Sequence, residues 1–150
     1  MGANFYSCGV RSPSPGAGAA YVTIHTGANL RAFVFDIQTA MSTTTQSLYA
    51  LFRTNNTPVA STSQLGQADD PQSATSTVNL DSAWSTAPTI GSNVYYRRFQ
   101  VSASAGAGFI WTWPENAPFV ISVSSWAVLW NFGGSAGSAS DVYVRWYEGA

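Results

Sequence analysis

Hydrophobic and polar residues alternate over short runs along most of the chain, and Gly, Pro, Ser and Asn separate the runs. This pattern is typical of β-strands, because successive side chains of a strand point to opposite faces of its sheet. Near the end of the chain, for example, Val142, Val144 and Trp146 fall on one face of a predicted strand. The predicted strands cover residues 20–26, 30–38, 48–54, 77–83, 94–101, 109–113, 119–123, 125–132 and 142–147.

Eight or nine strands in a chain of 150 residues predict one all-β domain, a jelly-roll-like β-sandwich. We expect this domain to span residues 20–150, after an N-terminal arm and linker in residues 1–19. Within these, residues 1–10 are the expected arm and residues 12–19 the Pro- and Gly-rich linker. Phe5, Tyr6 and Val10 give the arm an apolar character, so we expect it to reach away from the domain and pair with the sheet edge of a neighbour.

Two segments leave the pattern. Residues 55–76 contain an Asn pair, two prolines and many Ser and Thr, which predicts a long loop that is functional or held by a neighbour. Residues 38–52 also fit a helix, but three consecutive threonines weigh against it because β-branched residues are poor helix formers.

Charged residues are scarce, at 9% of the chain, and the formal net charge is −1. All six basic residues are arginines, and the chain has no lysine. Without a basic face, binding to nucleic acid is not expected. Near-neutral surfaces tend to associate, and Lys, Glu and Asp are depleted where proteins bury their surfaces against each other. We therefore expect much of the surface to be covered in an assembly; the alternative is that 34 Ser and Thr residues simply keep the chain in solution.

The cysteine count and the apolar segments bear on where in the cell the protein is made and used. Cys8 is the only cysteine, so an internal disulfide is impossible. The first residues lack the basic and apolar regions of a signal peptide, and no stretch approaches the ~20 apolar residues of a membrane helix. We expect a protein that is made in the cytoplasm, used without export and not bound to a membrane.

One catalytic motif is present. Residues 133–137, Gly-Gly-Ser-Ala-Gly, match the G-x-S-x-G pattern of a hydrolase nucleophile elbow around Ser135. That mechanism needs a helix after the serine and a histidine downstream, whereas a strand is predicted next and His25 lies far upstream. A flexible hairpin loop explains the same residues, and His25 itself fits a half-buried strand position.

The seven carboxylates show no catalytic pairing in the sequence. Asp69 and Asp70 are adjacent and can be read as calcium ligands, but a solvated turn before Pro71 is the favoured interpretation. The chain also lacks the third glycine of a nucleotide-binding loop. We therefore expect no enzyme activity, no metal and no cofactor.

Six tryptophans are many for this length, and most of them fit core positions. Alternation cannot bury every large residue, because Tyr95, Leu129, Tyr143 and Tyr147 fall opposite the other aromatic residues of their strands. Some aromatic surface is therefore expected to be exposed, and such surface contacts a partner or a carbohydrate.

Four segments of the chain resemble small virion proteins of tailed bacteriophages. They are residues 95–98 (Tyr-Tyr-Arg-Arg), 106–114 (Gly-Ala-Gly-Phe-Ile-Trp-Thr-Trp-Pro), 128–131 (Val-Leu-Trp-Asn) and 141–148 (Asp-Val-Tyr-Val-Arg-Trp-Tyr-Glu). The likeness extends roughly over residues 30–148 and is weaker in the first half. It implies a jelly-roll-like homo-oligomer, often a capsid decoration or cement protein that clamps neighbouring shell subunits, and it implies no active site.

On this basis we expect a structural protein on the capsid surface of the virion, bound to the major capsid protein and to itself, with a trimer as the favoured oligomer. The alternatives are a glycan-binding receptor module on a tail or head fibre, and another tail or neck component. The candidate partner contacts are Phe5, Tyr6, Val10, Asp69, Asp70, Arg97, Tyr143 and Tyr147.

Overall fold

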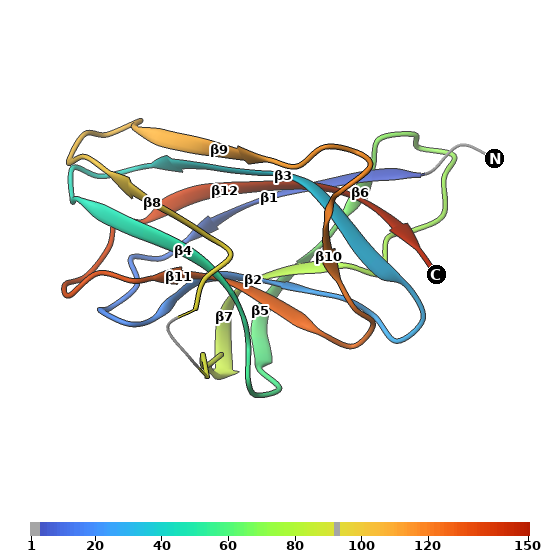
Figure 1. Cartoon of the computed structure of the whole chain (residues 1–150), viewed down its shortest axis with the longest axis horizontal. Helices are drawn as coiled ribbons and strands as arrows, with labels where there is room; N and C mark the ends of the chain where they lie inside the picture. The colour runs from blue at the N-terminus through green and yellow to red at the C-terminus, as the bar shows by residue number, and fades with distance from the viewer. Residues whose placement is uncertain (1–3, 92–93) are drawn as a thin grey trace.

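The computed structural model describes residues 4–91 and 94–150, which form twelve β-strands and no helix. The strands make two antiparallel six-stranded sheets that pack face to face as a β-sandwich (Figure 1). The described residues accordingly include no helix long and apolar enough to cross a membrane.

The first sheet brings the two ends of the chain together. Its strands lie in the order β10-β3-β12-β1-β6, and β9 pairs with a second part of β3. The first strand of the chain therefore pairs along its whole length with the last strand. The bounds are β1 (Phe5–Ser12), β3 (Arg31–Met41), β6 (Gln67–Ala68), β9 (Gly108–Thr112), β10 (Phe119–Ile121) and β12 (Ser140–Gly149).

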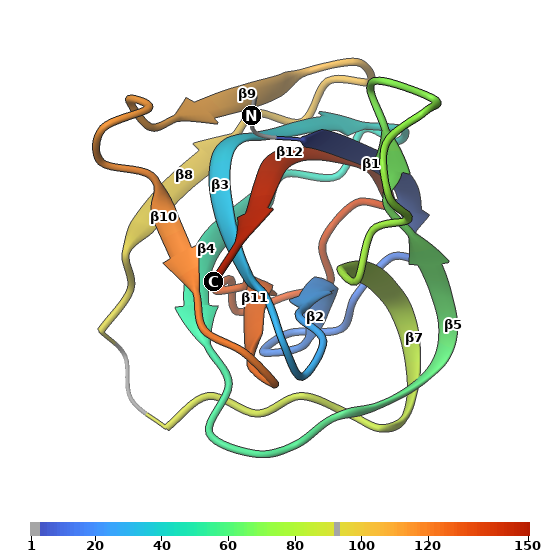
Figure 2. The ribbon, with the colours of Figure 1, turned by 90° about the vertical axis from the view of Figure 1, so that its right-hand side faces the viewer.

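The second sheet has the order β5-β7-β2-β11-β4-β8, so β5 and β8 are its edges. Figure 2 shows both sheets curving around a common interior, with β5 on one side and β8, β9 and β10 on the other. The bounds are β2 (Ala20–His25), β4 (Ser47–Arg53), β5 (Val59–Leu65), β7 (Asn79–Thr86), β8 (Arg97–Val101) and β11 (Trp126–Asn131). Each of the nine predicted strands overlaps one of these twelve, and strands β3 and β4 occupy the segment that also fitted a helix.

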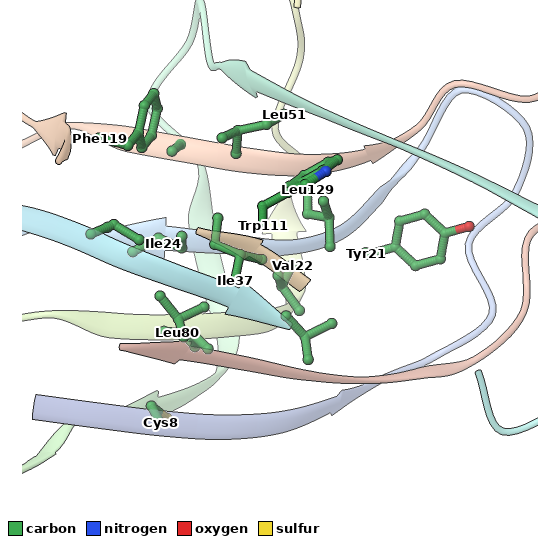
Figure 3. Packing of buried hydrophobic residues seen from close by; sticks show 14 of the residues in the cluster. Cys8, Tyr21, Val22, Ile24, Ile37, Leu51, Leu80, Trp111, Phe119 and Leu129 are labelled. Carbon is green, nitrogen blue, oxygen red and sulfur yellow. The ribbon is translucent and has the colours of Figure 1, made fainter. Parts of the chain in front are cut away.

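The main core lies between the sheets, and Figure 3 shows part of it. Val142, Val144 and Trp146 point into it from β12, which confirms the predicted alternation. Tyr21 and Tyr49 stack inside it with ring centroids 4.3 Å apart. Burial raises the pKa of both tyrosines, so both stay neutral at physiological pH.

A second, smaller core covers the outer face of the second sheet. Phe52, Val128 and Trp130 lie buried there, and Trp84 and Phe132 pack over them. Strand β11 is consequently buried on both faces, because Ala127 and Leu129 enter the main core. This second layer explains how a chain of this size accommodates so many large aromatic residues.

The N-terminal arm expected over residues 1–10 is wrong for the part that the structure describes. Residues 5–12 form β1, which lies between β12 and β6 inside the first sheet. Tyr6 and Cys8 are buried in the main core, and Tyr6 stacks on Trp146 with centroids 6.2 Å apart. The apolar side chains that were expected to contact a neighbour's sheet instead pack within the chain's own sandwich.

The long loop expected over residues 55–76 is also wrong, because this segment contains β5 and β6. Strand β5 pairs with β7 in the second sheet, and β6 pairs with β1 in the first. Gly66 lies between them against Trp146, where a Cβ atom would overlap the indole ring. The segment therefore crosses from one sheet to the other at a point where only glycine fits.

A single carboxylate fastens the following residues to the last strand. Glu148 of β12 accepts hydrogen bonds from the backbone N–H of Thr77 (3.0 Å) and from the hydroxyls of Ser76 (2.5 Å) and Thr77 (2.8 Å). The indole N–H of Trp146 also donates to it, at 3.2 Å. Four donors on one acceptor hold the end of β12 against the segment that leads into β7.

The position of β1 gives a direct test. Tyr6→Ala is expected to lower the free energy of unfolding by about 3–5 kcal/mol, because it removes a buried aromatic ring and a hydrogen bond to the Ala74 carbonyl. Ser7→Ala on the outer face of the same strand is the control, with an expected change of about 0.5 kcal/mol or less. Urea unfolding measures both changes in the free energy of unfolding. Equally small changes for the two variants would contradict the burial of Tyr6 and support the expected N-terminal arm.

Candidate protein-binding surface

Strand β8 forms an exposed edge of the second sheet and pairs with β4. Large aromatic residues reach solvent there: Tyr96 is 53% exposed and Phe99 is 44% exposed. Three arginines lie among them. We call this region the β8 surface and define it by Arg53, Tyr95, Tyr96, Arg97, Arg98 and Phe99.

Two of these arginines alternate with aromatic rings along the side of the sandwich. The Arg53 guanidinium lies 5.4 Å from the ring centroid of Tyr96 and 5.1 Å from that of Phe119. Phe119 packs against Trp113 at 5.6 Å, and the Arg97 guanidinium lies over Trp113 at 5.4 Å. The resulting arginine–aromatic ladder joins β4 and β8 of the second sheet to the β9–β10 region of the first.

The third arginine lies on the other face of β8, since neighbouring residues of a strand point in opposite directions. The Arg98 guanidinium is 5.9 Å from the Tyr95 ring centroid and 5.4 Å from that of Phe132. It covers the edge of the second core. Both faces of β8 therefore present guanidinium groups held on aromatic rings.

None of these three guanidiniums is paired with a carboxylate. Among residues 4–91 and 94–150, salt bridges join only Arg11 to Asp141 and Arg145 to Asp69. Stacking on a ring is worth about 0.5–1 kcal/mol at an exposed site and fixes the plane of the guanidinium. Arg53 already donates to the Tyr96 hydroxyl at 3.0 Å and to the Val120 carbonyl at 2.6 Å. The outer N–H groups of Arg97 and Arg98 keep the capacity to bind carboxylate or carbonyl oxygens, a bidentate geometry that lysine cannot supply.

The predicted contact residues divide between three environments. Phe5, Tyr143 and Tyr147 lie on the outer face of the first sheet, on neighbouring strands. Tyr6 instead points inward and is buried in the main core, so the structure contradicts its expected contact with a partner. Val10 is partly buried and packs against the same core. Arg97 belongs to the β8 surface, on the other sheet.

Phe5 and Tyr147 form an aromatic cluster with Phe33, which stacks on Tyr147 at 4.4 Å. The Arg145 guanidinium lies over Phe5 at 5.3 Å and also reaches Asp69 at 3.4 Å. The structure thus brings Asp69 beside Phe5, which the sequence did not show.

The two adjacent aspartates are occupied by their neighbours. Asp69 accepts from Arg145 and, at 3.3 Å, from the Ser7 hydroxyl, while Asp70 accepts from the backbone N–H of Gln72 at 2.9 Å in a turn. Across the described part of the chain, no three His, Cys, Asp or Glu side chains gather closely enough to hold a metal ion. Asp69 therefore forms an ion pair, and Asp70 stabilises a turn.

Sequence reasoning missed Arg53 as part of the β8 surface, and it missed Trp113 and Phe119 as the rings on which Arg97 and Arg53 stack. The only local signal of the β8 surface is the Tyr-Tyr-Arg-Arg run at residues 95–98, since the other members come from distant segments. Only the packing of the two sheets brings those rings against the arginines.

The G-x-S-x-G motif lies in the loop between β11 and β12, and a strand follows it. The loop is held at the start of β2, where the Asn131 backbone N–H donates to Ala19 and its side chain donates to the Ser135 carbonyl (2.9 Å). His25 is at the other end of β2, which is on the order of 16 Å away for a strand of this length. The motif's serine and the histidine therefore do not meet.

The last glycine of the motif has a packing role instead. Gly137 is buried, and a Cβ atom there would overlap the Tyr21 hydroxyl, whereas nothing lies within 4 Å of a Cβ at Gly134. Gly137→Ala is expected to destabilise the fold by about 1–3 kcal/mol through overpacking. Gly134→Ala and Ser135→Ala are the controls and should leave the thermal unfolding temperature unchanged; equal effects at the two glycines would contradict this role.

His25 stacks on Trp126 of the paired strand, with ring centroids 4.4 Å apart and an interplanar angle of 10°. Burial lowers the pKa of its imidazole, and the nearby Asp81 carboxylate opposes that effect. His25 is thus a half-buried strand residue, as predicted, and it is neutral at pH 7.

The single histidine makes this environment easy to measure. Proton NMR should give His25 a pKa below its ordinary value of about 6.5. Because the unfolded chain takes up the proton more readily, the free energy of unfolding should fall as the pH drops through that value. Trp126→Ala removes the covering ring and should move the pKa back toward 6.5; a pKa above 6.5 in the wild type would contradict the assignment.

Comparison of the chain with protein-family models, with curated proteins and with solved structures finds no match. Its function is therefore inferred from its own residues.

Proposed function

We propose that this protein is a non-enzymatic structural protein of a bacteriophage particle, which decorates and stabilises the capsid by binding neighbouring subunits of the major capsid protein as a homo-oligomer. The β8 surface is the observation that carries this proposal. It combines exposed aromatic residues with three arginines that have no carboxylate partner among the described residues. We assign to it the contact between copies of the chain, with a trimer as the expected assembly.

The chemistry of the β8 surface fits a protein partner. Tyr, Trp and Arg are the residues that most often dominate binding energy at protein interfaces, while Lys and Glu are depleted there. The arginines are already fixed by stacking, so less side-chain freedom is lost when they bind a partner's carboxylates or carbonyl groups. In a closed ring each copy offers this surface to a different surface of the next copy.

We also propose that the sandwich is a jelly roll. The pairings β1-β12-β3-β9 in one sheet and β2-β11-β4-β8 in the other support this, because they give eight strands arranged as two four-stranded sheets. Strands β5, β6 and β7 are then an insertion between β4 and β8 that extends the other side of the sandwich. Some viral capsid proteins have this fold, but a fold alone does not define a function.

Shell binding is proposed for the aromatic cluster of Phe5, Phe33 and Tyr147 on the outer face of the first sheet. Its apolar rings lie beside the Arg145–Asp69 ion pair, so the cluster offers both apolar packing and polar groups. This leaves the β8 surface free for contacts between copies.

Self-association is tested by sedimentation equilibrium. The wild type is expected as a trimer of about 48 kDa, three times the 15.9 kDa chain. Phe99→Ser and Arg97→Glu should shift the mass toward the monomer, because they remove an exposed ring and reverse a charge on the β8 surface. Val123→Ser, at a residue 41% exposed outside this surface, is the control. A monomeric wild type, or unchanged association in both variants, would contradict the proposal.

The location is tested by imaging the parent particle with the protein bound. Density at repeated positions on the capsid is expected. Density confined to the tail, neck or fibres would contradict capsid decoration and favour the other structural roles.

A further inference from the structure

The outer face of the first sheet contains a groove of about 680 Å³ at the end away from the Phe5 cluster. It crosses β9, β3, β12 and β1, and it lies on the sheet that does not contain β8. Neither the proposed association nor the proposed shell contact uses it. Its volume falls within the range of small-ligand sites, about 300–1,000 Å³.

The floor of the groove consists of small residues. Gly9 lies opposite Tyr143 in the β1–β12 ladder, and Ala40 lies opposite both Asp141 and Gly108. At Gly108 a Cβ atom would overlap the Thr39 carbonyl, so packing alone explains that glycine.

Gly9 has no such explanation. A Cβ atom there would come no closer than 3.9 Å to any neighbour, which is ordinary contact, and its φ angle is not positive. A glycine inside a strand costs about 0.5–1 kcal/mol relative to alanine. Such a glycine often marks a place where a ligand approaches the backbone closely. Here its missing side chain leaves open space beside the Tyr143 ring.

The walls combine an aromatic ring with fixed polar groups. Tyr143 is 36% exposed, and Ile110 on the opposite side is 60% exposed. At one end Arg11 donates two hydrogen bonds to Asp141, at 2.7 and 2.8 Å. Gln38, which lies opposite both Tyr143 and Ile110, adds an amide.

This lining matches the chemistry of a sugar. The ring of Tyr143 offers a face on which the C–H groups of a pyranose can pack. A carboxylate, a guanidinium and an amide supply acceptors and donors for neighbouring hydroxyls. Arg11 lowers the pKa of Asp141, so its carboxylate stays ionised and acts as an acceptor. The charges of Arg11 and Asp141 cancel, which favours a neutral ligand over a phosphate or an acidic peptide.

We propose that this groove binds a short neutral oligosaccharide, with one sugar ring packed on Tyr143 over Gly9 and its hydroxyls bound to the Arg11–Asp141 pair and Gln38. The site goes beyond the proposed structural role. It would give a particle that carries the protein an affinity for neutral surface glycans.

The test begins with a printed array of neutral and acidic glycans, probed with the wild-type protein. Neutral glycans that bind are then titrated into the ¹⁵N-labelled protein, where shifts are expected at Gly9, Gln38 and Tyr143. Gly9→Leu fills the groove without forcing a backbone clash, and Tyr143→Ala removes the stacking ring. Each should weaken binding at least tenfold while the amide spectrum shows a folded protein.

Arg97→Glu on the β8 surface is the matched control and should leave glycan binding unchanged while it reduces association, because Arg97 stacks on Trp113, which does not line the groove. Conversely, Gly9→Leu should leave the mass in solution unchanged. The experiments therefore distinguish failure of the saccharide site from failure of the proposed self-association. Binding of acidic glycans alone, no binding of neutral glycans, or full binding by both groove variants would overturn the saccharide site.

Discussion

The pairing of the last strand with the first is the interaction on which the rest of the structure depends. Strand β12 lies between β1 and β3 and places Val142, Val144 and Trp146 in the main core. Trp146 stacks on Tyr6 of β1 and leaves room only for glycine at position 66. It also donates to Glu148 of its own strand, which binds the segment that leads into β7. The outer residues of the same strand, Tyr143 and Tyr147, then define the exposed face of the first sheet.

The scarcity of charge shapes both the β8 surface and the groove. With few carboxylates available, Arg53, Arg97 and Arg98 are held by aromatic rings. Arg53 also donates within the chain, to the Tyr96 hydroxyl and the Val120 carbonyl, so Arg97 and Arg98 are the arginines that keep their donors for a partner. Arg11 is instead neutralised by Asp141, so the groove beside it carries no net charge from this pair. Arginine therefore has two roles, which depend on its neighbours. Beside aromatic rings it suits the edge of the second sheet to a protein partner, and beside Asp141 it suits the face of the first sheet to a neutral ligand.

The sequence predicted the strands well because alternation records which side of a strand is buried, as in β9 and β12. It failed for β1 and β5, where pairing with distant strands decides the structure and no local signal separates a strand from an arm or a loop. Of the predicted contacts, Arg97 lies on the β8 surface, Tyr143 in the groove, and Phe5 and Tyr147 in the cluster proposed to bind the shell. Tyr6 is buried, and Val10 packs against the main core. Arg53, Gly9 and Asp141 gained their roles only from neighbours far along the chain, which a single sequence does not reveal.

The central claim is that another copy of the chain covers the β8 surface. Amide hydrogen exchange tests it directly, because β5 and β8 are the two edges of the same sheet and serve as an internal comparison. Exchange is measured for both strands in dilute and in concentrated protein. The account predicts slower exchange for residues 97–101 at high concentration and no change for residues 59–65. Equal exchange of β8 at both concentrations in a protein that associates would contradict it.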